Sequence, residues 1–395
     1  MSMMRSIYLD NNATTALAPV VLDAMLPYLF SEYANPSSAS EAGVRVKKAL
    51  GDARIAVAHF MGATPAELIF TSGATESNQT AIMGALSLSK GKRHLITSQV
   101  EHPSVLLMCQ HLERLGIEVT YLPVDEEGRL SLEDLHAALR SDTALVSLMW
   151  ANNETGVVFP VAEATAIAHA AGALFHTDAT QAIGKASVNA VASGVDFLSC
   201  SAHKIHGPKG VGALFVRKGI ALPPLFHGHQ ERGRRGGTEN VPAIIGFGAA
   251  TRLVTDVESD ACYLRGLRDH FEQGLLAFMP CARIHGQEAE RLPNTSNIGF
   301  IAIDAEELLY RLEQKGITAA AGAACAAGRQ EPSHVLTAMG ISKTAVLSSL
   351  RFSFGRMNQL EDVEHLLRVL PSLLLDMMDM PPITAAPLIS CAHSQ

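Results

Sequence analysis

The feature that most constrains the fold is an alternation of short β-rich runs with helical stretches between about residue 40 and residue 250. Runs typical of buried strands fall at 68–71, 94–97, 118–121, 143–149, 173–176, 196–200 and 212–216. Helix-like segments lie among them at 41–60, 103–115, 132–139 and 162–171. Strands that alternate with helices form mostly parallel sheets covered by those helices. The pattern therefore predicts a wound α/β layer, and no linker rich in Gly, Pro or Ser divides it.

Beyond about residue 250 the sequence pattern changes. The stretch 251–278 is predicted to form one long helix, and shorter strand-like and helix-like pieces follow it. The end of the chain from Met380 onward is typical of a loose tail. A chain of 395 residues is long enough for two domains and a large buried core.

The composition narrows the classes of partner and compartment. A net charge of −8 argues against a general nucleic-acid binder. No run of about eighteen apolar residues suggests a membrane span, and the first residues lack the apolar region of a signal peptide. Six scattered cysteines without a C-x-x-C pair favour reduced thiols, and the histidines show no zinc-type spacing. We therefore expect a cytoplasmic protein without a structural metal that binds neither nucleic acid nor membrane.

Polar turns follow several of the predicted strands. Because ligands of open α/β sheets collect beyond the carboxyl ends of the strands, these turns form the candidate site. Its members in chain order are Ala74, Thr75, His102, Asn153, Asp178, Gln181, Ser201, His203 and Lys204.

Lys204 is the most informative of these residues. It directly follows a predicted buried strand and precedes a Gly-Pro-Lys-Gly turn. When desolvation or a neighbouring cation lowers its pKa, such an amine becomes a nucleophile that can form a Schiff base. An isolated lysine in a loop is more often simply exposed, so the neighbouring turns decide between the two interpretations.

The other turns supply the groups that pyridoxal phosphate requires. Small residues at 72–78 would leave backbone N–H groups free for a phosphate, although many such turns are only helix caps. Asp178 could pair with the ring nitrogen and keep the ring an electron sink, and Gln181 could reach the phenolic oxygen. His102 could stack on the ring and assist proton transfer, or be merely structural. Together with Lys204 these residues predict a pyridoxal-phosphate site.

A series of ordered segments carries a family resemblance. They are 8–15, 35–38, 71–78, 101–103, 152–156, 178–181, 201–210, 228–241, 323–325 and 351–353. In these segments, and over essentially its whole length, the chain resembles cysteine desulfurases of the fold-type I, class-V aminotransferase-like group. The segments 152–156 and 228–241 are most similar to the nitrogen-fixation branch, with the housekeeping iron–sulfur branch close behind.

The resemblance implies an architecture and a set of roles. It implies an α/β fold with a large cofactor-binding domain at 15–255, built on a mixed, mostly parallel sheet between helices. A smaller α+β domain would comprise 1–14 and 256–395 and carry the catalytic cysteine loop. Lys204 and His102 would be catalytic. The implied cofactor-binding residues are Ala74, Thr75, Asn153, Asp178, Gln181, Ser201, His203 and, from the partner subunit of an obligate homodimer, Thr238.

Substrate binding is assigned to two further residues. Arg351 matches the residue that holds the substrate carboxylate, a role suited to the bidentate guanidinium fork. The alternative is an ordinary arginine at the edge of the core. Asn35, in the segment 35–38, joins the implied substrate site.

Cys325 decides between a desulfurase and a plain aminotransferase. It lies in a segment of alanines and glycines, where a cysteine is often a buried small hydrophobe but where a mobile loop could also deliver a thiolate. Alanines stand where relatives commonly carry serines, and Arg329 is unusual, which puts loop mobility and turnover in question. The resemblance implies that Cys325 receives sulfur as a persulfide and could transiently ligate iron in a nascent cluster.

The predicted function is the conversion of L-cysteine to L-alanine. The sulfur would pass through Cys325 to an iron–sulfur scaffold protein, which the resemblance to the nitrogen-fixation branch links to nitrogenase. An aminotransferase or a selenocysteine lyase on the same scaffold is the second interpretation. A non-catalytic partner protein that retains the fold is the third, and the intact set of Lys204, Asp178, Arg351 and Cys325 argues against it.

Overall fold

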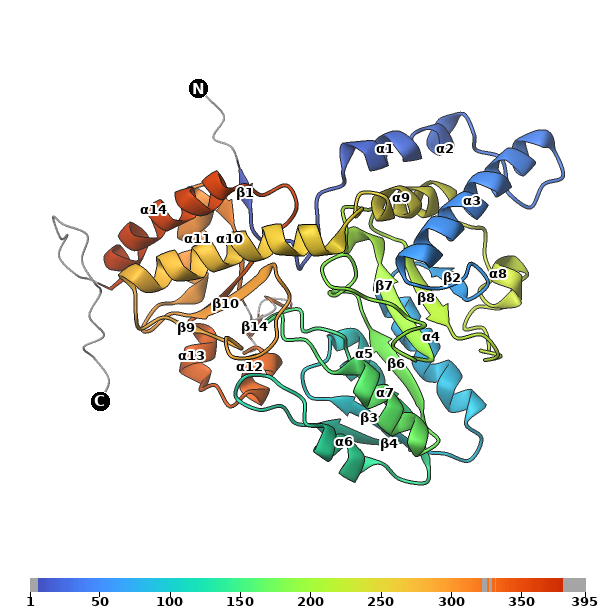
Figure 1. Cartoon of the computed structure of the whole chain (residues 1–395), viewed down its shortest axis with the longest axis horizontal. Helices are drawn as coiled ribbons and strands as arrows, with labels where there is room; N and C mark the ends of the chain where they lie inside the picture. The colour runs from blue at the N-terminus through green and yellow to red at the C-terminus, as the bar shows by residue number, and fades with distance from the viewer. Residues whose placement is uncertain (1–5, 322–324, 327–328, 331, 379–395) are drawn as a thin grey trace.

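The computed structural model describes residues 6–321, 325–326, 329–330 and 332–378. A seven-stranded sheet in the order β2-β8-β7-β6-β5-β3-β4 forms the centre of its larger part (Figure 1). The strands are β2 (Leu68–Thr71), β3 (His94–Ser98), β4 (Glu118–Leu122), β5 (Thr143–Ser147), β6 (Leu174–Asp178), β7 (Phe197–Ser201) and β8 (Gly212–Val216). Only β8 runs antiparallel to its neighbours in this sheet. The predicted mixed, mostly parallel sheet is confirmed, with a strand at each of the seven predicted places.

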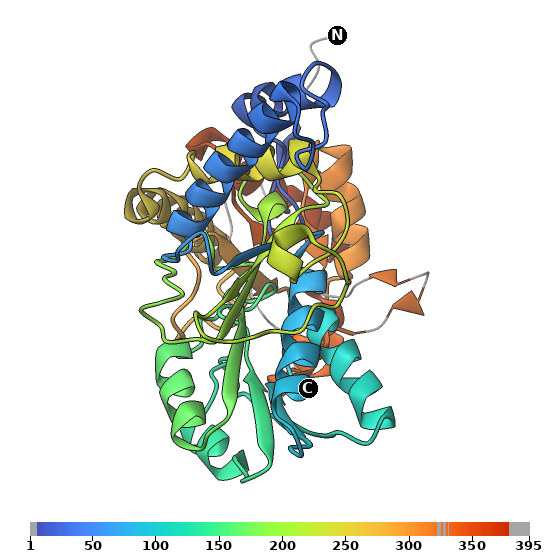
Figure 2. The ribbon, with the colours of Figure 1, turned by 90° about the vertical axis from the view of Figure 1, so that its right-hand side faces the viewer.

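Helices cover both faces of this sheet because successive strand residues point to opposite sides. Ile69, Leu95 and Leu145 pack in one core with α4 (Ala74–Leu88) and α5 (Pro103–Arg114). Their chain neighbours Leu68, Ile96 and Val146 pack in a second core. That core also takes residues of α3 (Glu41–Phe60), α6 (Leu132–Ala138), α7 (Val161–Ala170) and α9 (Val241–Thr251). Figure 2 shows the sheet between α7 on one side and α4 and α5 on the other.

A smaller sheet in the order β12-β15-β10-β9 lies in the other part of the molecule. It consists of β9 (Arg283–Ile284), β10 (Thr295–Gly299), β12 (Ala320–Ala321) and β15 (Ser349–Ser353). A third core joins it to α10 (Val257–Phe278), α11 (Ala305–Gln314) and α14 (Leu360–Met377). The N-terminal β1 (Ile7–Tyr8) pairs in parallel with β11 (Ile317–Thr318) and adds Ile7 to this core.

Two short helices link the two parts. Residues of α12 (His334–Ala338) and α13 (Lys343–Leu347) pack in the core of the larger part, although in sequence they lie between β12 and β15 of the small sheet. The domain boundaries given above stay a prediction. The remaining short elements are α1 (Pro19–Met25), α2 (Pro27–Phe30), α8 (Gln230–Gly233), the single helical turn η1 (Ala202–Lys204), β13 (Cys325–Ala326) and β14 (Arg329–Gln330).

The prediction of one helix over 251–278 is wrong at its beginning. The helix α9 ends at Thr251, and α10 begins only at Val257. Asp256 starts the second helix because its Oδ1 accepts the backbone N–H groups of Glu258 and Ser259 at 3.0 and 3.1 Å. Within the described part of the chain, none of the helices is both long and apolar enough to cross a membrane.

Candidate active site

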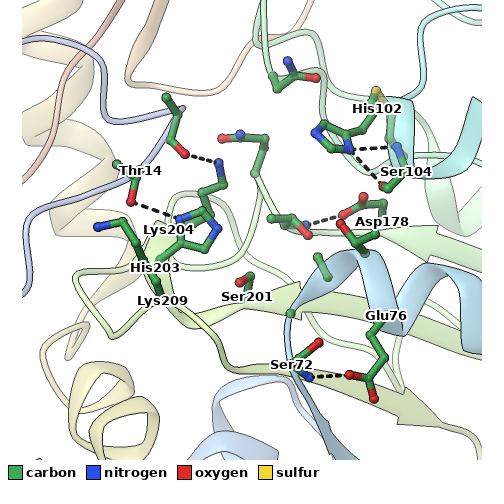
Figure 3. A pocket seen from close by; sticks show the side chains of 18 of the residues that line it. Thr14, Ser72, Glu76, His102, Ser104, Asp178, Ser201, His203, Lys204 and Lys209 are labelled. Atoms are coloured by element: carbon green, nitrogen blue, oxygen red, sulfur yellow. Dashed lines mark hydrogen bonds between the residues drawn. The ribbon is translucent and has the colours of Figure 1, made fainter. Parts of the chain in front are cut away.

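A cavity of about 490 Å³ lies at the carboxyl ends of the strands of the large sheet (Figure 3). The turns after β2, β3, β6 and β7 open into it, as parallel strands require of the polar groups that follow them. Most of the predicted site residues line this cavity: Ala74, Thr75, His102, Asn153, Asp178, Gln181, Ser201, His203 and Lys204.

Lys204 ends the helical turn η1 that directly follows β7. Its Nζ donates hydrogen bonds to the backbone oxygens of Asn12 and Ala13 at 2.5 and 2.8 Å. Burial, reinforced by the Arg351 guanidinium, lowers the pKa of Lys204 to about 8. A larger fraction of this amine is therefore uncharged near neutral pH than in an ordinary lysine, and the uncharged form is the nucleophile.

Asp178, the last residue of β6, is held in place by its neighbours. Its Oδ2 accepts a hydrogen bond from Asn78 Nδ2 at 2.7 Å, and its Oδ1 accepts the Thr180 backbone N–H at 3.0 Å. The same Asn78 nitrogen donates to Ser104 Oγ at 2.9 Å. Both N–H groups of this buried amide are thus used, so the orientation of the carboxylate is fixed.

His102 lies at the end of this chain of hydrogen bonds. Its Nδ1 accepts the backbone N–H of Ser104 at 3.1 Å and lies 2.8 Å from Ser104 Oγ, so it caps α5. Burial lowers the pKa of His102, with Lys204 and His334 adding to the effect and Asp178 opposing it. Because Nδ1 is an acceptor, the neutral ring carries its proton on Nε2.

The beginning of α4 gives one end of the cavity groups that are suited to bind an anion. The first backbone N–H groups of a helix lack intrahelical acceptors, and here they belong to Ala74 and Thr75. Ser201 and His203 lie on the same cavity. Burial, followed by Lys204, lowers the pKa of His203 to about 4, so its ring is neutral and can donate one hydrogen bond and accept another.

This set of groups fits pyridoxal phosphate. Helix N–H groups with a hydroxyl and an imidazole suit its phosphate, a partly uncharged amine suits its aldehyde, and a fixed carboxylate suits its ring nitrogen. Ala74, Thr75, Ser201 and His203 would hold the phosphate, Asp178 the ring nitrogen, and Lys204 the aldehyde.

Arg351, in the middle of β15, lies next to the cavity rather than on its wall. Its Nη1 donates to the backbone oxygen of Asn153 at 2.9 Å, and its Nη2 pairs with Asp10 at 2.6 Å. Its Nε is buried without a hydrogen-bond partner. The guanidinium therefore has an N–H group free to donate a hydrogen bond, next to Asn153, which lines the cavity.

The remaining predicted residues lie farther from the cavity. Thr238 lines an adjoining cavity of about 200 Å³, which shares Ser72 and Gly210 with the first. Asn35 is exposed, accepts the backbone N–H of Ser37 at 2.8 Å and is absent from the lining of the cavity, so the structure does not bring it to the site. The backbone of Cys325 pairs with Gln330 between β13 and β14, while its side chain lies outside the described residues.

Three buried residues that sequence reasoning missed hold the site together. Asn12 donates to Thr295 Oγ1 at 2.8 Å and to the Asn153 backbone oxygen at 3.1 Å. Asn78 connects Asp178 to Ser104, and Lys185 contacts the side chains of Asn12 and Gln181. Asn12 and Asn78 fall in the segments 8–15 and 71–78 that carry the resemblance, but no motif singled out Lys185.

The cysteines differ in part from the expectation of reduced thiols. Cys109, Cys200 and Cys262 are free, whereas Cys281 is disulfide-bonded, so the expectation is wrong at that position. The described residues contain no group of three or more His, Cys, Asp or Glu side chains that could hold a metal ion.

Comparisons with known proteins agree with this geometry. Residues 7–366 match the family model of the class-V aminotransferases. A cysteine desulfurase of Cereibacter sphaeroides is 49% identical over 385 residues, which cover 97% of this chain and 99% of that protein. The cysteine desulfurase NifS of Azotobacter vinelandii is 44% identical over 382 residues, covering 96% of this chain and 95% of that protein.

Solved structures lead to the same group. A NifS-like protein has a TM-score of 0.88 at 36% identity, covering 95% of this chain and 100% of the other. The protein SspA in complex with cysteine has a TM-score of 0.79 at 35% identity, covering 88% of this chain and 99% of the other. The chain therefore belongs to the class-V aminotransferases, a family of pyridoxal-phosphate enzymes with the fold-type I architecture. Within that family it belongs with the cysteine desulfurases, and the predictions of fold, cofactor and enzyme class are confirmed.

Proposed function

We propose that this cysteine desulfurase moves the sulfur of L-cysteine onto Cys325 as a persulfide and then to an iron–sulfur scaffold protein. The C–S bond of the substrate breaks, the S–S bond of the persulfide forms, and L-alanine leaves with the hydrogen that the Cys325 thiol and solvent supply. The observation that carries this proposal is the convergence of Lys204, Asp178 and His102 on one cavity beside Arg351.

The residues of the cavity divide the work by their charge and position. Bound pyridoxal phosphate supplies an aldehyde for the substrate amine and a ring that accepts electrons. Asp178 places its carboxyl group at the position proposed for the ring nitrogen. Lys204 Nζ, with its pKa near 8, can take the proton from the substrate Cα, and the Nε2–H of the neutral His102 ring can donate a hydrogen bond to a group in the cavity. Arg351 would exchange Asp10 for the substrate carboxylate.

The chain beyond Cys325 returns to the wall of the cavity, which supports its proposed role. Ser333 Oγ donates to Glu154 Oε2 at 2.5 Å, and His334 Nε2 lies 2.9 Å from the backbone oxygen of Glu101. Glu154 and Glu101 are the chain neighbours of Asn153 and His102, which line the cavity. The β13–β14 pair, at the right of Figure 2, lies at the edge of the molecule, where an acceptor protein could approach Cys325. In our proposal Cys325 also transiently ligates iron of the cluster being assembled.

The proposal includes a homodimer in which Thr238 completes the phosphate site of the partner subunit. Supporting this, Thr238 is exposed and lines the cavity that adjoins the phosphate end. Large apolar side chains are exposed on and near α1, α2 and α3, among them Phe30 at 67% and Tyr33 at 80%. Exposed apolar side chains that come from neighbouring elements are a feature of many interfaces.

The proposed setting is cytoplasmic iron–sulfur assembly, in the nitrogen-fixation branch. The compartment rests on the composition alone. The branch rests on the sequence segments 152–156 and 228–241 and on relatives named NifS. Reconstitution of a cluster on a purified scaffold protein, with L-cysteine as the sulfur source, tests the acceptor. Failure of every scaffold to accept sulfur would contradict it.

The sulfur-transfer step is tested by following both products. The holoenzyme is mixed with L-cysteine under reductant, and alanine and sulfide are quantified together with the visible spectrum. We expect equal amounts of alanine and sulfide, and no persulfide on Cys325→Ala although that variant keeps its cofactor colour. Cys262→Ala removes an exposed free thiol and is the matched control with normal activity. If Cys325→Ala released as much sulfide as the native enzyme, or if the enzyme transferred the amino group to a keto acid, the proposal would be contradicted.

The shared site is tested by mixing two inactive variants. In a hybrid of Lys204→Ala and Thr238→Ala subunits, one of the two sites regains both native residues if Thr238 acts across the interface. We expect activity to reappear after the subunits are exchanged. No recovery, with dimers verified by sedimentation, would show that Thr238 acts within its own subunit.

A further inference from the structure

Lys185 is a buried lysine for which the proposed reaction has no use. It lies in the turns after β6, and only 6% of it is exposed. Its Nζ donates to Gln181 Oε1 at 2.9 Å and to Asn12 Oδ1 at 3.1 Å. No acidic side chain of the described residues forms a salt bridge with it. A buried lysine without a carboxylate is rare and calls for a specific reason.

The surroundings of Lys185 favour its uncharged form. Burial lowers its pKa well below the ordinary value, and the nearby charges of Lys204 and Arg351 act in the same direction. The other titratable groups that it influences, His203 and His206, have lowered pKa values. An uncharged amine has two N–H groups, and the two hydrogen bonds of Lys185 use both of them. The geometry therefore suits a neutral amine that acts as a donor of two hydrogen bonds.

The contact with Lys185 determines which end of the Gln181 amide faces which neighbour. The oxygen Oε1 is turned to Lys185, and the nitrogen Nε2 donates to the backbone oxygen of Asn12 at 2.9 Å. An amide nitrogen has two N–H groups, so one remains available on a side chain that lines the cavity. A reversed amide would place its oxygen against the Asn12 oxygen and its nitrogen against a donor.

We infer that Lys185 is a positioning residue that keeps the Gln181 amide turned so that it presents an N–H group, and not its oxygen, to the phenolic oxygen of the bound cofactor. This inference rests on the proposed role of Gln181 in the cofactor site. A hydrogen bond donated to that oxygen stabilises its negatively charged form. Lys185 thereby tunes the protonation of the cofactor without touching it.

The test is a pH titration of the visible absorption of the holoenzyme without substrate. Lys185→Met keeps the length of the side chain and removes both donors. We expect the pKa of the chromophore to rise by about half a unit to one unit, because the oxygen loses a fixed donor. Gln181→Leu should shift it by a similar amount, and the double variant should show no further shift, since both changes remove the same hydrogen bond. Lys185→Gln, which can still donate to Gln181, should restore most of the native value.

Lys92→Met is the matched control, because Lys92 also donates two hydrogen bonds, to the backbone oxygens of Thr143 and Gly172, but does not line the cavity. It should leave the titration unchanged. An unshifted titration of Lys185→Met would overturn the inference. Additive shifts in the double variant would also overturn it, because Lys185 would then affect the chromophore independently of Gln181. If Lys185→Met does not fold, Lys185→Gln alone tests the inference. A shift of its chromophore pKa as large as that of Gln181→Leu would overturn the inference. Failure of the proposed function would look different, because the variants would show the expected shifts in titration while the holoenzyme formed no alanine and sulfide from L-cysteine.

Discussion

The two walls of the cavity are built in different ways. One wall, the strand-end wall, consists of residues at or just beyond the ends of strands of the large sheet, such as Asp178 and Lys204. The other wall is lined by Ala13 and Thr14 and is backed by Asn12 and by Arg351 of the small sheet, which form hydrogen bonds with residues far away in sequence. Asn12, for example, contacts Thr295, and Arg351 contacts Asp10. The first wall carries the reactive groups, and the second aligns them and holds the two sheets together.

The largest effect is expected on the strand-end wall, from Lys204→Ala. Loss of the amine should lower kcat at least about a thousandfold, since general-base catalysis alone contributes up to about 10⁴. The cofactor should no longer be trapped on the protein by borohydride reduction, which mass spectrometry detects. Lys90→Ala, at an exposed lysine, is the control with normal trapping. Borohydride labelling that persists in Lys204→Ala would assign the reactive amine to another residue.

Asn12→Ala tests whether the opposite wall is structural. The change removes one hydrogen bond from each of the buried side chains of Lys185, Asn294 and Thr295. We expect the free energy of unfolding, measured in urea on the apoprotein, to fall by about 2–4 kcal/mol. Gln110→Ala, which removes an exposed amide, should change it by less than about 0.5 kcal/mol. Equal stability of the two variants would remove the distinction between the walls.

The strand-end wall was largely predictable from the sequence, and the opposite wall was not. Asp178 and Lys204 could be predicted because the end of a buried apolar run marks the end of a strand, and parallel strands bring their carboxyl ends to one edge of the sheet. The contacts of Asn12, Asn78 and Lys185 depend on where distant segments meet, which periodicity does not encode. The break between α9 and α10 was missed for a local reason, since Asp256 outweighs the continuous helical pattern by capping a new helix.

Arg351→Lys tests the alignment function of the second wall. A lysine keeps the charge but loses the planar fork that can hold Asn153 and a carboxylate together. We expect KM for L-cysteine to rise about 10- to 100-fold while kcat changes less, in steady-state assays of alanine formation. Arg252→Lys, at an exposed arginine, should leave both constants unchanged. A fall in kcat with unchanged KM would instead assign Arg351 to the chemical step.

Glu101 lies behind the strand-end wall, next to His102. Its titration shows whether the polar groups of that wall lower the free energy of unfolding. Burial, with Asp178 adding to it, raises its pKa to about 8, although Oε1 accepts hydrogen bonds from Ser98 and the Met149 backbone. The folded protein therefore holds this proton more tightly than the unfolded chain, whose carboxyl titrates near the ordinary value of 4.5. The contribution of Glu101 to the free energy of unfolding must then fall as pH rises from about 4.5 to about 8, by at most about 1.4 kcal/mol per pH unit.

Glu101→Gln should remove this fall, because the amide keeps the two accepted hydrogen bonds and has no proton to lose. Urea unfolding at pH 5, 6.5 and 8 should give nearly equal stabilities of the two proteins at pH 5 and a growing advantage of the variant above it. Glu364→Gln, at an exposed carboxylate, should follow the native curve. Parallel curves for native protein and Glu101→Gln would mean that the carboxyl is ionised at no cost. The strand-end wall would then be as fully compensated as the hydrogen-bonded wall around Asn12, and the contrast between the two would be one of chemistry alone.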